Sequence, residues 1–304
     1  MLQKIKDLLK AVVERYRVNE QLRSLTAPIF VDGFPDSRNF GDALNISLVK
    51  YLSGKDVFPS RFLKQTPQNL ATSYAVIGSV CQWSRPQTII WGAGFIGEEF
   101  KTKDFVKPSH ILAVRGPLSR AIYRNNGIDC PTCYGDPALL LPLIYNPTIA
   151  PIYEYGIIPH YADWDANWVK QYRSDKNMLV INIMTSNNHE LFVKQLKSCR
   201  KIVTSSLHGL ILAQAYGIPV CAIKLSDSVA GGEFKFADYL LSVGRVPKER
   251  INLSEQDIPI EDLSYDKEPI HIDLAPLIEA CPFIQPDQRA YLLSKSRNYY
   301  QIEN

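Results

Sequence analysis

The chain has 304 residues, of which 46% are hydrophobic and 21% are charged. At roughly 150 residues per domain this length predicts two domains, which can bury a core without disulfides or a metal. These values exclude a disordered chain, a collagen-like fibre and a small disulfide scaffold. The net charge of +3 is too small to indicate a nucleic-acid partner.

The cysteines and the apolar runs predict a soluble cytoplasmic protein. Six cysteines lie in apolar stretches without the spacing of a small secreted scaffold, and reduced cysteines are typical of the cytoplasm. The single CxxC motif at 130–133 has no second pair at zinc-site spacing, so we predict no metal. The longest apolar run, 209–225, is broken by Gln214, Gly217 and Pro219, whereas a membrane span needs about 20 apolar residues.

The first 18 residues, MLQKIKDLLKAVVERYRV, predict a basic amphipathic helix. Apolar residues recur at helical spacing, lysines and arginines lie between them, and the order of a signal peptide is absent. Two interpretations remain open. The helix packs on the rest of the protein, or its basic face contacts a membrane surface.

In the first half of the chain, apolar runs of strand length alternate with helix-period segments. Such alternation indicates an α/β fold with a parallel sheet. Each expected strand ends at a glycine, aspartate or arginine, which is where an open parallel sheet places its ligands. We expect strands at 28–31, 74–78, 88–94 and 111–115, and helices at 40–52 and 118–124.

The second half repeats this pattern after a loop at 142–151 that is rich in proline, tyrosine and asparagine. We therefore predict two Rossmann-like α/β lobes facing a central cleft, 1–149 and 150–304, with the tail packing back on the first lobe. We expect strands at 155–160, 178–183, 201–205 and 220–223, and helices at 189–196, 206–216, from 234 and from 274.

The sharpest functional pattern is the sequence SSLHG at 205–209, where a predicted strand passes into a helix. The unpaired N–H groups of a helix start bind phosphate or carboxylate, and Ser205, Ser206 and Gly209 lie there. An imidazolium at His208 would bind the same anion or donate a proton. The alternative is that the serines cap the helix and His208 is simply buried.

Arg115 ends a predicted strand and precedes a Gly-Pro turn into a helix. A guanidinium in that place binds a carboxylate or phosphate through two hydrogen bonds. The alternative is an ion pair with a structural acid such as Asp136.

The remaining candidates follow other strands or turns. Asn39, Gly41 and Asp42 open a helix, where they would bind sugar hydroxyls or supply a base, although capping also explains them. His160 follows the first strand of the second half, and Lys235 follows a Gly-Gly loop from which it would reach an anion. The glycines at 92–94 do not form a dinucleotide fingerprint.

Taken in order, these motifs resemble those of the polysaccharide pyruvyl transferases. The resemblance spans about residues 28–245, and its most diagnostic part is SSLHGL followed by AYGIP. The motifs are NFGD at 39–42, WGAG at 91–94, VRGPLS at 114–119, GDP at 135–137, IPH at 158–160, SSLHG at 205–209, AYGIP at 215–219 and FKFADY at 234–239.

The resemblance implies a two-lobed fold like that of the GT-B glycosyltransferases. It also implies transfer of pyruvate from phosphoenolpyruvate to two hydroxyls of one sugar, which forms a cyclic ketal and releases phosphate. Some relatives have an arginine where this chain has Ser206, and Lys224 or Lys235 would replace its charge. We predict a lipid-linked saccharide acceptor at the inner face of the membrane, no metal or redox cofactor, and no particular oligomeric state.

On this hypothesis the two lobes divide the reaction. His208, or else His160, protonates the methylene carbon, and Asp42 or Asp136 acts as base toward a sugar hydroxyl. Arg115 and the helix start at Ser206 bind the anionic groups of phosphoenolpyruvate. The first lobe, which carries Asn39, faces the acceptor sugar.

Two other functions stay open. A GT-B glycosyltransferase would hold the diphosphate of a nucleotide sugar at the same helix start and the ribose with Asp227 or Glu233. A regulator that binds phosphate or a glycan without turnover is the third possibility, and the serine at position 206 is its only support.

Overall fold

The computed structural model describes residues 27–34, 38–62, 71–186 and 188–300. The expected amphipathic helix at the amino terminus lies outside these residues. Among the residues described, no helix is long and apolar enough to cross a membrane.

The first lobe is built on a five-stranded parallel sheet with the order β2-β1-β3-β4-β5. Every strand expected in this half is present, although shorter than its apolar run. The edge strand β2 was not predicted, because three residues carry no alternation that a sequence pattern can show. The strands are β1 (Ile29–Val31), β2 (Val57–Pro59), β3 (Ser73–Ala75), β4 (Thr88–Trp91) and β5 (His110–Ala113).

Two helices of this lobe begin and end where local chemistry dictates. Helix α2 (Phe40–Ser53) is capped by the Asn39 side chain and ends at Gly54, whose φ of 67° favours glycine. Helix α3 (Pro117–Asn125) begins with a proline, which has no N–H to leave unpaired.

The second lobe repeats the topology, with the parallel order β10-β9-β8-β6-β7. In both lobes the first strand lies between the second and the third. The strands are β6 (Tyr153–Ile158), β7 (Met178–Val180), β8 (Cys199–Thr204), β9 (Val220–Lys224) and β10 (Ile251–Asn252). Its helices are α5 (Asn167–Lys170), α6 (His189–Lys197), α7 (Leu207–Ala215) and α8 (Phe234–Ser242).

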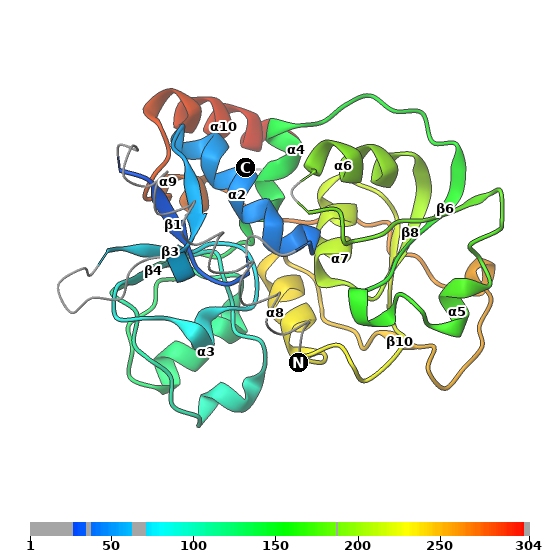
Figure 1. Ribbon diagram of the computed structural model, residues 1–304, viewed down its shortest axis with the longest axis horizontal. Helices are drawn as coiled ribbons and strands as arrows, with labels where there is room; N and C mark the ends of the chain where they lie inside the picture. The colour runs from blue at the N-terminus through cyan, green and yellow to red at the C-terminus, as the bar shows by residue number, and fades with distance from the viewer. Residues whose placement is uncertain (1–26, 35–37, 63–70, 187, 301–304) are drawn as a thin grey trace, which may run out of the picture.

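The expected fold class is therefore confirmed: the protein is an α/β protein with two five-stranded parallel sheets, consistent with two Rossmann-like lobes arranged as in GT-B enzymes (Figure 1). The interlobe loop predicted from 142 starts with one helical turn, α4 (Leu141–Ile144), which the sequence did not reveal. Short 3₁₀ turns occur at Ser60–Phe62, Cys81–Trp83, Glu98–Lys101, Pro137–Leu140, Tyr161–Asp163 and Ile260–Asp262.

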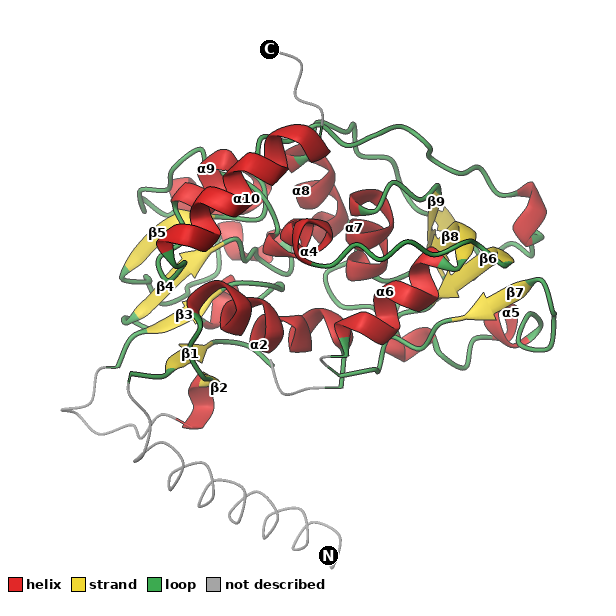
Figure 2. Cartoon of the chain, turned by 90° about the horizontal axis from the view of Figure 1, so that it is seen from above, coloured by secondary structure: helices red, strands yellow, loops and turns green. Residues whose placement is uncertain are grey.

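The last two helices, α9 (Ala275–Glu279) and α10 (Pro286–Tyr299), lie beside the first lobe (Figures 1 and 2). The Trp91 Nε1–H of β4 donates to the Leu277 carbonyl at 2.8 Å, and the Tyr300 hydroxyl donates to the Leu139 carbonyl at 2.6 Å. The exact domain division at residue 149 stays a prediction.

The two lobes share one hydrophobic core. Phe40 at the start of α2 stacks on Phe192 of α6 with ring centroids 4.2 Å apart. The Phe40 N–H also donates to the Ile183 carbonyl at 2.8 Å. These contacts bring the amino end of α2 to the second lobe, where α7 begins.

Candidate active site

Strand β8 passes directly into helix α7, and Thr204 and Gly209 fix the turn. The Thr204 hydroxyl donates to the Ile158 carbonyl at 2.8 Å and accepts from the Ser206 N–H at 3.0 Å. A Cβ on Gly209 would lie 2.2 Å from the Thr204 Oγ1, so glycine is required for the helix to begin this close to the strand. Gly209, expected to bind substrate, therefore has a packing role as well.

The amino terminus of α7 has no side-chain cap. Ser206 occupies the N-cap position, but its hydroxyl makes no capping hydrogen bond, contrary to the capping interpretation. The helical ladder starts with the Leu210 N–H, which donates to the Ser206 carbonyl at 3.1 Å. The N–H groups of 207–209 precede it and carry the partial positive charge of the helix end.

His208 and Asp136 form a buried pair behind this helix start. The His208 Nε2 lies 4.0 Å from the Asp136 Oδ2, and neither atom has a hydrogen-bond partner. The other carboxyl oxygen accepts from the Ala138 N–H at 2.9 Å. A distance of 4.0 Å is too long for a hydrogen bond, so the two groups lie side by side without one.

Burial shifts the pKa of both groups toward their neutral forms. It raises the pKa of the Asp136 carboxyl to about 6. Burial, together with the positive charges of Arg115 and Lys235, lowers the pKa of the His208 imidazole to about 3. The resting pair therefore has a neutral imidazole beside a carboxyl that binds a proton more readily than usual.

Gly41 of the first lobe contacts the imidazole of His208. A Cβ on Gly41 would lie 1.9 Å from the His208 Nδ1. The Nε2 is enclosed with Asp136, and the Nδ1 edge of the ring lies against Gly41. The imidazole thus stands between a buried carboxyl and the lobe junction, and Asp136 is not placed to touch a ligand itself.

Asn39 and Asp42 flank Gly41. The Asn39 Oδ1 accepts from the Gly41 N–H at 3.2 Å, which is the capping interpretation. Asp42 is half-buried, and its Oδ1 would lie 3.5 Å from a Cβ on Gly78, so it faces the loop after β3.

Arg115 is fully buried and joins the two lobes. Its Nε donates to the Asp238 Oδ2 of α8 at 3.0 Å, and other guanidinium nitrogens donate to the Ser79 hydroxyl at 2.6 Å and the Phe95 carbonyl at 2.7 Å. The arginine pairs with an acid, as in the alternative interpretation of the sequence, but that acid is Asp238 and not Asp136. The anion that Arg115 binds in this structure is a carboxylate of the second lobe.

Lys235 comes from the same helix and is only 8% exposed. Its Nζ donates to the Ala230 carbonyl at 2.7 Å. Burial lowers the pKa of Lys235 to about 8, and the charges of Arg115 and Arg250 contribute. The loop before it touches the first lobe, because a Cβ on Gly231 would lie 2.2 Å from the Ile96 carbonyl oxygen.

Ser205 forms hydrogen bonds with both His160 and Asp163, and Asp163 was not predicted as a site residue. The Ser205 hydroxyl accepts from the His160 N–H at 2.9 Å and donates to the Asp163 Oδ2 at 2.7 Å. The Ser226 hydroxyl donates to the other Asp163 oxygen at 2.5 Å. Asp163 therefore joins the carboxyl ends of β6, β8 and β9. Burial, aided by Lys235, lowers the pKa of the His160 imidazole to about 4.

The structure thus brings most predicted site residues to the lobe junction, around His208 and Lys235. It does not bring Lys224, which pairs with the exposed Asp227 at 2.6 Å on the surface. Asp238 lies in the recognised motif at 234–239, three residues after Lys235. Its partner, Arg115, is 123 residues away in the sequence, so the sequence did not predict this ion pair.

No group of three or more His, Cys, Asp or Glu side chains that could hold a metal is found among the described residues. The cysteines at 130 and 133 are free thiols. Burial raises the pKa of the Cys130 thiol to about 12 and that of Cys133 to about 11.

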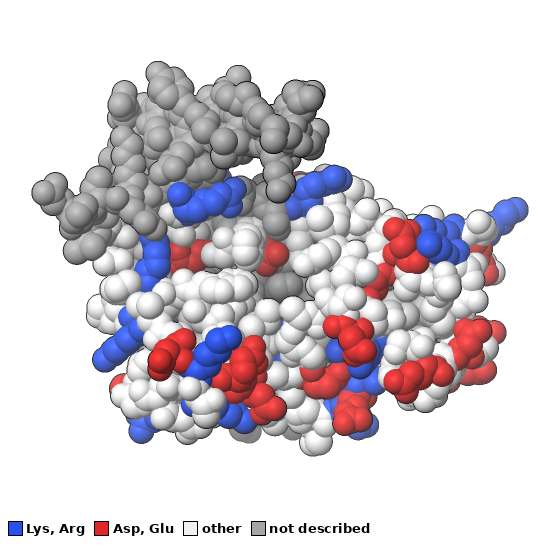
Figure 3. Space-filling view, turned by 60° about the horizontal axis from the view of Figure 1, so that its bottom comes forward, with Lys and Arg blue, Asp and Glu red and all other residues white. Residues whose placement is uncertain are grey.

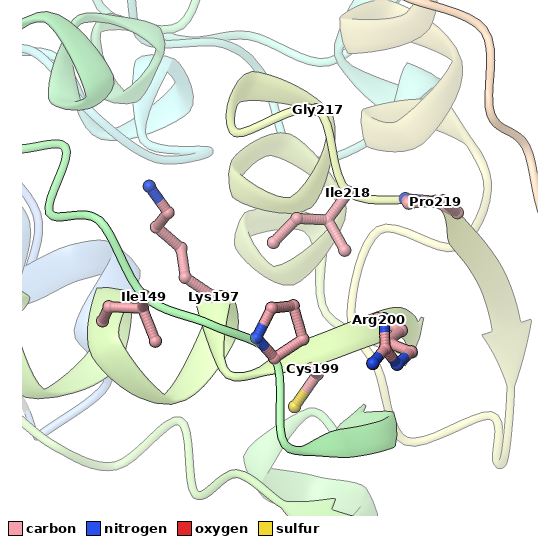
Figure 4. A pocket seen from close by; sticks show the side chains of 8 residues that line it. Ile149, Lys197, Cys199, Arg200, Gly217, Ile218 and Pro219 are labelled. Carbon is pink, nitrogen blue, oxygen red and sulfur yellow. The ribbon is translucent and has the colours of Figure 1, made fainter.

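A cavity of about 300 Å³ lies at the opposite end of β8 and α7 (Figure 4). Its lining comes from the start of β8, the turn after α7 and the interlobe loop, and includes Cys199, Ile218 and Ile149. No predicted site residue borders it. The junction around His208 is therefore a separate feature.

The model of the polysaccharide pyruvyl transferase family matches residues 39–227 of this chain. The chain belongs to this family. Membership implies a transferase, and the matched region contains Gly41, Asp136 and His208.

Two relatives and one solved structure are similar to the chain. The uncharacterized protein L143 of Acanthamoeba polyphaga mimivirus is 32% identical over 229 residues, which are 71% of this chain and 75% of L143. The succinoglycan biosynthesis protein ExoV of Rhizobium meliloti is 24% identical over 212 residues, 68% of this chain but only 62% of ExoV. The solved structure is that of KP1_0663, a functionally uncharacterized protein of Klebsiella pneumoniae. It aligns with a TM-score of 0.40 and 15% sequence identity, and the alignment covers 74% of this chain and 92% of the KP1_0663 chain.

Proposed function

We propose that the protein transfers pyruvate from phosphoenolpyruvate to two hydroxyls of a saccharide, forming a cyclic ketal. The observation that carries this proposal is the buried, unbonded pair of His208 and Asp136 beside Gly41, in a chain of the pyruvyl transferase family. The pair supplies a proton relay at the place where the two lobes meet.

Positive charge is concentrated where an anionic donor would bind. Phosphoenolpyruvate carries a phosphate and a carboxylate. The uncapped start of α7 and the ammonium of Lys235 are both next to His208 and bind these groups. The buried guanidinium of Arg115 adds to the field without leaving Asp238. On the face that Figure 3 draws, lysines and arginines lie among acids over the described residues.

The proton balance assigns a task to each group. The two sugar hydroxyls lose two protons, of which one ends on the methylene carbon and the other on the released phosphate. His208 delivers the proton to the methylene carbon, and the bound anions raise the pKa of its imidazole above the resting value of about 3. Asp136 stabilises the imidazolium from behind.

The acceptor lies on the side of the first lobe. Asp42, at the start of α2, takes the proton of an attacking hydroxyl, and Asn39 lies beside it. His160 is the second candidate for the acid, held in place by Ser205 and Asp163. We propose a lipid-linked acceptor at the inner face of a membrane.

The test uses phosphoenolpyruvate with a panel of surface saccharides, and measures phosphate release together with the mass of the saccharide. We expect release that depends on the saccharide, and a product heavier by one pyruvate less one water. The His208→Gln variant should be slower by roughly 10² or more, the usual scale for a general acid. The control is His110→Gln, an exposed histidine at the first residue of β5, the opposite end of that strand from Arg115. Equal rates in a folded His208→Gln protein would remove this histidine from its role.

A further inference from the structure

Two exposed aromatic side chains of the first lobe form a pair at the carboxyl edge of its sheet. Phe34 and Trp83 are each 53% exposed, and their rings meet edge to face with centroids 5.5 Å apart. Large aromatic side chains left in water together are typical of a binding surface.

The topology puts this pair at a particular place in the sheet. Phe34 follows β1 and Trp83 follows β3, and these two strands are neighbours with connections that leave in opposite directions. In an open parallel sheet such a switch point holds the ligand, outside the carboxyl ends of the strands. In the second lobe the matching switch point lies between β6 and β8. His160 follows β6, and His208 lies in the helix that follows β8.

The Trp83 backbone is held rigidly. Its N–H donates to the Val80 carbonyl at 3.0 Å, and the Cys81 N–H donates to the Gly94 carbonyl at 3.1 Å. The neighbouring Gln82 side chain donates to the Ser79 carbonyl at 2.7 Å and accepts from the Ile96 N–H at 3.2 Å. A backbone held in this way does not have to be ordered when a ligand binds.

The two loops are also packed on one another and bordered by a charged pair. A Cβ on Gly33 would lie 2.9 Å from the Val80 Cγ1, so the loop carrying Phe34 rests on the loop carrying Trp83. Arg85, 27% exposed at its side chain, donates to the Asp32 Oδ1 at 3.3 Å. Polar groups beside an aromatic surface suit a ligand that has both apolar C–H faces and hydroxyls.

The same loop reaches the proposed active site. Ser79, four residues before Trp83, accepts the hydrogen bond from the Arg115 guanidinium at 2.6 Å. The aromatic pair is therefore continuous with the lobe junction on its first-lobe side.

We propose that Phe34 and Trp83 form a saccharide subsite that stacks on sugar rings of the acceptor. The inference rests on the proposed function for the identity of its ligand. The occupant is a saccharide rather than a protein, because the pair adjoins the junction where a sugar hydroxyl would be modified.

The test is binding of the full-length protein to an array of bacterial surface saccharides, with Phe34→Ala and Trp83→Ala as variants. We expect the Trp83→Ala protein to bind the same saccharides roughly tenfold more weakly or worse, since aromatic anchors dominate such contacts. The matched control is Tyr291→Ala, an aromatic residue of α10 that is 43% exposed. It should bind as the unmodified protein does.

Three results would overturn the subsite: equal affinity in Trp83→Ala, no saccharide bound by the unmodified protein, or a change in oligomeric state in Trp83→Ala without loss of saccharide binding. The midpoint of thermal unfolding with phosphoenolpyruvate, measured on the same proteins, separates this proposal from the donor chemistry. Trp83→Ala should keep the shift. An unmodified protein that binds saccharides without any shift would contradict the donor and leave the subsite standing.

Discussion

Gly41 and His208 come from different lobes and touch. A Cβ at position 41 would lie 1.9 Å from the imidazole Nδ1, so a side chain there would displace the ring. The contact joins the amino ends of α2 and α7, and it holds His208 against Asp136 from the side opposite the carboxyl.

Replacing Gly41 with alanine should move His208 and reduce turnover by roughly 10², the effect of misplacing a catalytic group by about 1 Å. The comparison is Gly54→Ala at the end of α2. A Cβ there meets no atom within 4 Å, but the φ of 67° makes alanine strained. Gly54→Ala should therefore lose about 1 kcal/mol of stability and keep its kcat. Equal kcat values in the two variants would contradict the proposed contact.

Asp136→Asn should make the protein more stable at neutral pH while it impairs turnover. Burial raises the pKa of the Asp136 carboxyl in the folded protein from 3.8 to about 6. Between pH 3.8 and pH 6 the folded protein therefore keeps a proton on this carboxyl that the unfolded chain has lost. Stability therefore falls as pH rises from 3.8 through 6, and the cost stays at its full size above pH 6. An asparagine keeps an oxygen for the Ala138 N–H and removes that cost, up to roughly 3 kcal/mol.

Urea unfolding of both proteins between pH 4 and pH 8 measures this effect. The difference in unfolding free energy should grow with pH and level off above pH 6. A variant that is less stable than the unmodified protein at pH 8 would show that the carboxylate stabilises the fold.

Asp238→Ala should cost roughly 3–5 kcal/mol, because it leaves the buried Arg115 guanidinium without its counter-charge. The Ser119 N–H and hydroxyl would lose the same partner, to which they donate at 2.9 and 2.6 Å. The paired variant Arg115→Leu with Asp238→Leu removes both charges and should recover much of the loss. Urea unfolding measures both, and a cost below 1 kcal/mol for Asp238→Ala would refute the ion pair as a link between the lobes.

The affinity for phosphoenolpyruvate should fall above pH 8. Burial lowers the pKa of the Lys235 ammonium to about 8 in the unliganded protein, so the ammonium loses its charge as the pH rises through 8. The KM for phosphoenolpyruvate should rise as pH passes this value, and Lys235→Gln should have a high KM with a flatter pH profile. Lys201, a half-buried lysine on β8 that pairs with Glu154 at 3.1 Å, gives the control Lys201→Gln. An unchanged profile in Lys235→Gln would assign the pH dependence to another group.

Much of the fold could be predicted, because its signals are local. Buried parallel strands such as β9 contain continuous apolar runs, here Val220 to Ile223, and helix starts such as Asn39 and Pro117 carry capping or start signals. The strands of the first lobe were shorter than expected, since residues such as Val76 and Ile77 are apolar for burial in the core rather than for pairing in the sheet.

The site was predicted in part, and what was missed depends on distant contacts. The residue types after each strand were recognisable, so His208, Gly41 and Lys235 could be named. The partner of Arg115 and the role of Asp163 follow from how loops of different strands meet, which no spacing encodes. Whether a polar residue faces a ligand or another side chain is likewise decided by the packing of the two lobes.

The most direct measurement is the midpoint of thermal unfolding with and without millimolar phosphoenolpyruvate, with inorganic phosphate and nucleotide sugars as controls. A ligand at 100 times its Kd stabilises the folded protein by about 2.7 kcal/mol, which is a visible shift. We predict a rise with phosphoenolpyruvate that Lys235→Gln reduces. No rise with phosphoenolpyruvate, or a rise with a nucleotide sugar alone, would contradict it.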